Sequence, residues 1–162
     1  MYQLAQVNIA RMLAPLDDPL MAYFVAKLDE INALSEHSPG FVWRFQTEAG
    51  NATDMRPYED ERIIFNMSVW SSLEVYTDFV YKTMHREIMQ MRRQWFERFE
   101  GAYTAVWWVP AGHIPGVEEA KERLEHLRTY GESAFAFTPK KPFPPADAPT
   151  QTIKPILEEC PA

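Results

Sequence analysis

Two stretches of the chain limit its possible folds more than any other part. Residues 62–70, "RIIFNMSVW", and 103–110, "YTAVWWVP", have the branched and aromatic content of β-strands. An antiparallel strand with one face in water alternates apolar and polar residues, whereas these two stretches carry apolar residues on both alternating sets of positions. The sheet that contains them is therefore expected to be covered on both faces.

Strand and helix patterns follow one another along the chain. The helices are marked by apolar residues three to four positions apart, by Asp18 as an N-cap before Pro19, and by Gly131 as a C-terminal stop. In order, the sequence predicts a strand at 2–10, a helix within 17–37, strands at 41–46 and 62–70, a helix from 71 to 99 with a kink near Thr83, a strand at 103–110, a helix at 117–131 and a short strand at 133–137.

This order is β-α-β-β-α-β followed by an added α-β, which is the order of a ferredoxin-like α+β sandwich with its helices on one face of the sheet. Because such helices leave the second face open, the apolar strands favour a homodimer packed sheet to sheet. The alternative is that the tail or the last helix of the same chain folds over that face.

The prolines divide the chain into two parts. Six of the 13 prolines lie in "TPKKPFPPADAPTQTIKP", where neither a regular helix nor a central strand is expected. We therefore predict one domain at 1–138 and an extended tail at 139–162. The tail is expected to dock through Phe143, or through Ile156 and Leu157.

Charge and cysteine content narrow the class of protein. The chain has 16 basic and 23 acidic residues and a net charge of −7, so a nucleic-acid partner is not expected. No stretch has the length and apolar content of a membrane helix, and the first residues lack the pattern of a signal peptide. The single cysteine, Cys160, permits no disulfide within the chain, and together these features indicate a cytoplasmic protein.

The stretch "KTMHREIMQMRRQWFERF" (82–99) contains the most informative polar pair. On a helix, His85 and Arg92 lie about 20° apart on a face that is otherwise made of methionine, isoleucine and aromatic residues. A buried guanidinium needs a carboxylate or a ligand, because burial of an unpaired charge is costly. The two residues therefore either pair with internal acids such as Asp29 or line a binding site.

The binding-site interpretation gives each candidate residue a role. His85 is the candidate general base, and Arg92 and Asn66 are the candidate donors that hold a substrate anion. Asn66, Ser68 and Trp70 share one face of their strand by alternation. The candidate substrate-binding residues are Asn8, Trp43, Ser68, Trp70, Trp95, Phe96 and Trp108.

Several stretches together resemble a bacterial family of unknown function in the dimeric α+β barrel superfamily, which includes the antibiotic-biosynthesis monooxygenases. They are "SPGFVWRFQTEAGNATD", "NMSVW", "FVYKTMHREIMQMRRQWFERF", "WWVPAGHIP", "EEAKERLEHLRTYG" and "AFAFTPKKPFP", and they span nearly all of residues 1–145. The resemblance implies the fold and the homodimer but supplies no reaction. The superfamily also contains haem proteins, isomerases, cyclases and binding modules.

Three functions are therefore open at the level of sequence. The first is a small-molecule enzyme without a nucleotide cofactor, either a monooxygenase or an isomerase or cyclase, acting on an apolar or aromatic substrate. The second is a haem-binding protein with His85 as the axial ligand. The third is a ligand-binding or structural dimer without turnover. No dinucleotide or P-loop motif and no metal-ligand spacing occurs in the chain, and the loop at 47–61 is either a lid or variable surface.

Overall fold

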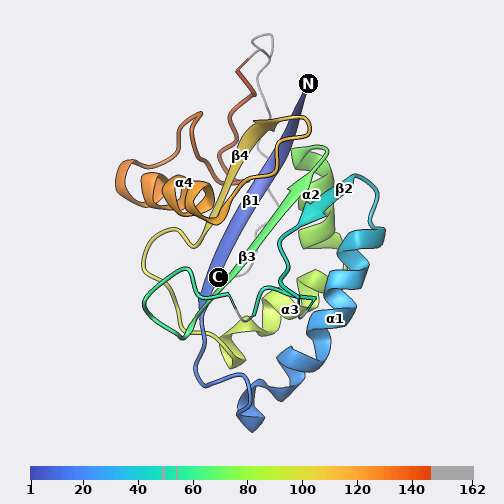
Figure 1. The fold of residues 1–162 in the computed structure, drawn as a ribbon, viewed down its shortest axis with the longest axis vertical. Coiled ribbons are helices and arrows are strands. Elements are labelled where there is room, and N and C mark those ends of the chain that lie inside the picture. Colours follow the sequence, from blue (N-terminus) through green and yellow to red (C-terminus); the bar gives the residue numbers. More distant parts are fainter. Residues whose placement is uncertain (49, 54, 147–162) are drawn as a thin grey trace.

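The computed structural model describes residues 1–48, 50–53 and 55–146 (Figure 1). In those residues, strands and helices follow one another in the predicted order from the first strand to the helix after the fourth strand. The elements are β1 (Tyr2–Arg11), the 3-10 helix η1 (Pro19–Met21), α1 (Ala22–His37), β2 (Phe41–Arg44), β3 (Ile63–Trp70), α2 (Leu73–Lys82), α3 (Met84–Met91), the 3-10 helix η2 (Arg92–Gln94), β4 (Thr104–Pro110) and α4 (Val117–Tyr130).

The four strands form one antiparallel sheet in the order β2-β3-β1-β4. The first and last strands of the β-α-β-β-α-β unit are thus neighbours, with β1 in the centre beside β3. This topology confirms the predicted ferredoxin-like α+β fold. No helix in the described residues is long and apolar enough to cross a membrane.

Each strand divides its residues between two faces of the sheet. On β1, Ala5, Val7 and Ile9 belong to a core that includes three buried α4 residues, Ala120, Leu124 and Leu127. We call this side the α4 face. Residues of the alternate set, such as Leu4 and Trp70, pack with α2 on what we call the α2 face. Figure 1 shows α4 and α1 on opposite sides of the strands.

The covering of the α4 face bears directly on the predicted homodimer. The prediction from the strands assumed that this face is open, but Trp107 is fully buried there, and its indole N–H donates to Glu119 of α4 at 3.0 Å. Tyr58, from the loop before β3, packs against the same core. The two-sided apolar strands are therefore explained within one chain, as in the alternative in which the last helix covers the sheet. The homodimer stays a prediction that rests on the family resemblance.

The helical region after β3 differs from the predicted continuous helix. It breaks at Thr83, where the prediction has a kink, and it ends with η2 instead of continuing to residue 99. Beyond η2, Phe96 forms an antiparallel bridge with Met12, and the Glu97 N–H donates to the Arg11 carbonyl at 2.8 Å. Backbone pairing with the end of β1 thus overrides the helical pattern of these residues.

The last predicted strand and the start of the predicted tail lie along β4. Within 133–137 only Phe137 pairs with the sheet, by an isolated bridge to Val106. Phe143 lies against Phe137, and its carbonyl accepts from the Trp108 indole N–H at 2.7 Å. Ile156 and Leu157, the other predicted docking residues, lie outside the described residues, and the division at residue 138 stays a prediction.

The burial of α4 side chains predicts how much stability is lost when their packing is weakened. Leu124→Ala should lower the free energy of unfolding by about 2–5 kcal/mol, because Leu124 is fully buried against the sheet. Glu122→Ala, at an exposed position of the same helix, is the control and should change it by less than about 0.5 kcal/mol. Urea denaturation measures both values, and a near-neutral Leu124→Ala would mean that α4 does not form part of the core.

The contacts of Phe143 predict where the chain can be shortened. Truncation after Ala146 should leave the melting temperature unchanged, because the proline-rich residues beyond it are not expected to build a core. Truncation after Thr138 should lower it by about 4–8 °C, since it removes Phe143 and the acceptor of the Trp108 N–H. Equal melting temperatures for the two truncations would contradict a structural role for residues 139–146.

Candidate functional site

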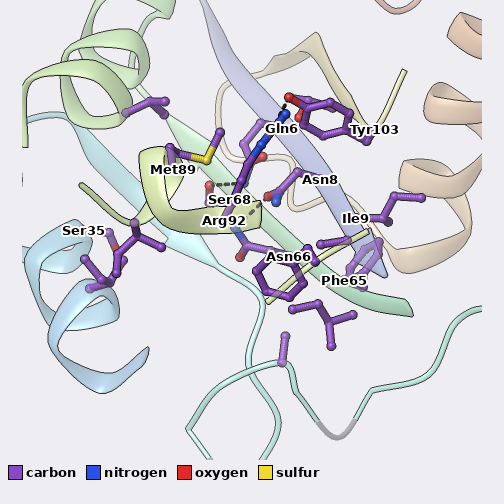
Figure 2. Close-up of a pocket in the computed structure, with 18 of the residues that line it drawn as sticks. Gln6, Asn8, Ile9, Ser35, Phe65, Asn66, Ser68, Met89, Arg92 and Tyr103 are labelled. Atoms are coloured by element: carbon purple, nitrogen blue, oxygen red, sulfur yellow. Dashed lines mark hydrogen bonds between the residues drawn. The ribbon is translucent and has the colours of Figure 1, made fainter. Parts of the chain in front are cut away.

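A cavity of about 640 Å³ lies between the α2 face of the sheet and the helices α1, α2 and α3 (Figure 2). Helix α1 makes its main contacts with η1, β2 and α3 rather than with the two central strands. Its apolar residues Leu28 and Ile31 are only half-buried, and both line the cavity. The volume is that of a typical small-molecule site.

The sheet supplies a polar floor to this cavity. Strand register brings polar residues of neighbouring strands into two adjacent rows on the α2 face, separated by two residues and hence by about 7 Å along the strands. One row consists of Thr104, Asn8 and Asn66, and the other of Gln6, Ser68 and Arg44.

Hydrogen bonds across the strands order these side chains. The Asn66 amide donates to the Asn8 carbonyl oxygen at 3.0 Å. One row further, the Gln6 amide and the Trp70 indole both donate to the Ser68 hydroxyl oxygen at 2.8 Å. Asn66 is exposed although it lies in the middle of β3, because β2 pairs only with the last part of that strand. The cavity is therefore open beside Asn66.

An irregularity in β2 decides which of its side chains reach the cavity. The register shifts between Phe41 and Trp43, so that Trp43 pairs with Val69 and Arg44 pairs with Ser68. Trp43 consequently packs with the core of the α4 face, and Arg44 lines the cavity. Simple alternation from Phe41 places these two residues the other way round.

Arg92, at the start of η2, is the most unusual cation of the cavity wall. Its guanidinium donates a hydrogen bond to the Tyr103 hydroxyl and lies 4.6 Å from the centre of the Tyr103 ring. In the part of the chain that the structure describes, no carboxylate pairs with Arg92. Since the Tyr103 oxygen accepts from Arg92, its own proton is available to a ligand. The two residues together present several donors at one place.

The other charged groups of the cavity are engaged or lie in solvent. Lys27 pairs with Glu30 at 2.9 Å, and this hydrogen bond raises the pKa of the Lys27 ammonium. Arg44 pairs with Glu36 at 2.7 Å. Six cationic side chains line the cavity against two acidic ones, although the whole chain carries −7. The cationic residues are Lys27, Arg44, Arg92, Arg93, Arg98 and Lys140, and the acidic residues are Glu97 and Glu132.

The two acidic residues do not neutralise Arg92. Glu97 pairs with Arg62 and, at 3.6 Å, with Arg11. Glu132 accepts a long hydrogen bond of 3.5 Å from the Thr138 hydroxyl. The cavity therefore favours a negatively charged ligand at Arg92.

The structure brings together six of the predicted site residues and places three others elsewhere. Those that line the cavity are Arg92, Asn66, Asn8, Ser68, Trp70 and Phe96. Trp43 faces the opposite core, Trp95 is buried in a cluster with Met12, Met21 and Phe24, and Trp108 packs with Phe137 and Phe143. The backbone of His85 belongs to α3, but its side chain lies outside what the structure describes.

Gln6 and Tyr103 are among the cavity residues that the predicted site did not include. Strand alternation could have identified Gln6, since it shares the alternating face of Asn8 on β1. No sequence pattern identifies Tyr103, because its contact with Arg92 depends on where η2 ends relative to β4. Asn51, Ala52 and Thr53 of the loop at 47–61 also line the cavity. No group of His, Cys, Asp and Glu side chains in the described ranges could hold a metal ion.

The fold and the cavity define a ferredoxin-like α+β protein with a polar, cationic chamber between its helices and its sheet. The chain belongs to the family described as Domain of unknown function (DUF3291), which matches residues 3–153. This confirms the predicted relation to a family of unknown function. No curated protein matches the chain significantly.

Two solved structures are similar to this chain. One is a protein of unknown function from Nitrosomonas europaea, with 10% identity, a TM-score of 0.48 and coverage of 72% of this chain and 97% of the other. The second is a candidate antibiotic biosynthesis monooxygenase from Chloroflexus aurantiacus J-10-fl, with 16% identity, a TM-score of 0.43 and coverage of 70% and 99%.

The environment of Arg92 predicts that it contributes little to folding. Arg92→Met should leave the free energy of unfolding within about 1 kcal/mol of wild type, or raise it, because it loses the contacts with Tyr103 but no carboxylate of the described chain loses its partner. Arg44→Met is the comparison and should cost more, because it breaks the pair with Glu36. Chemical denaturation measures both variants. A loss above about 2 kcal/mol in Arg92→Met would indicate a structural ion pair instead.

Proposed function

We propose that the chain is a small-molecule enzyme that binds an apolar or aromatic acid or phenol in this cavity and acts on it without a nucleotide cofactor. The observation that carries the proposal is the Arg92 guanidinium, which faces a chamber of about 640 Å³ without a carboxylate partner in the described residues. A cation in this position is maintained for a ligand when the fold itself does not need it.

The cavity walls support a role for each part of such a ligand. Arg92 and the Tyr103 hydroxyl hold the anionic group by charge-assisted hydrogen bonds. Asn66 and Asn8 offer further amide groups beside it. Trp70 and Phe96 provide aromatic walls for the apolar body. His85, on α3, is proposed as the base that removes a proton from the substrate.

These groups serve more than one reaction. A base that forms a substrate anion and donors that hold it are the requirements of cofactor-independent oxygenation, of isomerisation and of cyclisation alike. A binding protein without turnover would use the same chamber without the base. The proposal therefore divides into a binding step and a chemical step, which are tested separately.

The binding step is tested with planar aromatic acids and phenols by isothermal titration calorimetry. Wild type should bind at least one of them, and Arg92→Met should weaken that binding by about 10- to 100-fold, the value of a charge-assisted hydrogen bond. Arg86→Met, an exposed position of α3 that does not line the cavity, is the matched control and should bind as wild type does. Equal affinities for Arg92→Met and Arg86→Met would contradict the proposed site.

The chemical step is tested by mass spectrometry of each bound compound after incubation with the protein. Product that forms in air and not under nitrogen indicates a monooxygenase, and product under both indicates an isomerase or cyclase. His85→Phe should retain binding and lose product. Binding without product from any compound would favour the binding-protein alternative, and a Soret band after haem addition that is lost in His85→Ala would favour haem.

A further inference from the structure

Gln6 is the one deeply buried polar side chain of the cavity with an unmet hydrogen-bonding atom among the described residues. It is 2% exposed and lies in the middle of β1, on the face that forms the cavity floor. Its amide nitrogen donates to Ser68, but its carbonyl oxygen is buried and has no hydrogen-bond partner in the described chain. A buried carbonyl without a partner costs about 1–3 kcal/mol, which a bound ligand can offset.

The Ser68 hydroxyl has an unused donor that complements the unused acceptor of Gln6. Its oxygen accepts from both the Gln6 amide and the Trp70 indole, so its own proton is left to donate. Gln6 and Ser68 therefore present one unmet acceptor and one unmet donor side by side on the cavity floor. A hydroxyl group meets both needs at once, since it donates one hydrogen bond and accepts another.

The same conclusion holds if the Gln6 amide is turned over. Ser68 then donates to the Gln6 oxygen, and the amide nitrogen is left with hydrogens that need an acceptor. A hydroxyl oxygen accepts one of them. In either orientation the inner floor is matched by a small neutral polar group and not by a methyl or ring C–H.

We infer that the ligand of this cavity is a hydroxy acid or hydroxyphenolate, whose anionic group binds at Arg92 and Tyr103 and whose separate hydroxyl group binds at Gln6 and Ser68. This inference rests on the proposed function and names its substrate class more closely. Figure 2 shows the Arg92–Tyr103 pair and the Gln6–Ser68 pair at the same cavity.

The spacing of the floor supports a ligand with two separated polar groups. Gln6 lies one polar row from Asn8, about 7 Å along the strand. Asn8 pairs with Thr104, which directly follows Tyr103. The backbone of Tyr103 therefore lies beside the Asn8 row, one row away from Gln6 and Ser68.

The experiment compares three ligands of nearly the same size: 6-hydroxy-2-naphthoate, 2-naphthoate and 2-naphthol. Calorimetric titration of the full chain should show that wild type binds the hydroxylated acid about tenfold more tightly than 2-naphthoate, the value of one well-made hydrogen bond. Gln6→Met, which has a similar volume and no polar group, should retain 2-naphthoate binding and lose the tenfold preference.

Two further variants make the comparison specific. Gln3→Met changes the same residue type on the same strand outside the cavity and should keep the preference. Ser68→Ala removes the hydroxyl partner and should reduce the preference even if Gln6→Met folds poorly.

Failure of this inference differs from failure of the proposed function. If wild type binds 6-hydroxy-2-naphthoate and 2-naphthoate equally, the hydroxyl site is overturned and the anion site stands. If Gln6→Met keeps the full preference, the hydroxyl is bound elsewhere and the inference is also overturned. Binding of 2-naphthol alone, or of none of the three, would overturn the anion site and with it the substrate class inferred here.

Discussion

The polar rows in the middle of the sheet determine how the rest of the α2 face is built. A helix that packed directly on Asn8 and Asn66 would remove from water the amide groups that are left over after their mutual hydrogen bond, at a cost of about 1–3 kcal/mol for each unmet group. Helix α1 instead makes its main contacts with β2 and α3. A cavity is the structural consequence of this arrangement, since the polar floor cannot be closed by an apolar helix.

Packing on the opposite face of the sheet stabilises the fold enough for it to tolerate such a cavity. Trp107, Met67 and Val7 are fully buried on the α4 face, so the main core of the sheet is complete without the α2 face being fully packed. Trp95 has a related role near the site. Trp95 is 2% exposed in a cluster with Met12 and Phe24. Because it directly follows η2, the packing of its side chain holds η2, and with it Arg92, in place. A binding group mounted on a packed element keeps its geometry better than one on a loop.

The sequence predicted the element order, the ferredoxin-like fold and half of the polar residues of the cavity floor, because these depend on local patterns. Alternation places Asn8, Asn66 and Ser68 correctly once their strands are known. Trp43 and Phe96 show where local patterns end. The bulge in β2 turns Trp43 to the other face, and the bridge with Met12 replaces a helix at Phe96. Both depend on pairing between distant segments, which no spacing along one segment reveals. The position of α4 also depends on tertiary packing, because its sequence does not reveal which face of the sheet it covers.

The charge distribution of the chain connects the fold to the proposed chemistry. A protein with net charge −7 repels organic anions at long range, where salt screens the effect beyond about 8–10 Å. Inside the cavity the local balance is reversed, and Arg92 acts at short range where screening is weak. Selectivity for an anion therefore has to come from contact with Arg92 and Tyr103 and not from steering by the surface. An apolar body that can leave water adds favourable transfer energy of about 25 cal/mol per Å² to that contact. The combination favours amphipathic acids over small inorganic anions, which gain the charge contact but have no apolar surface to bury.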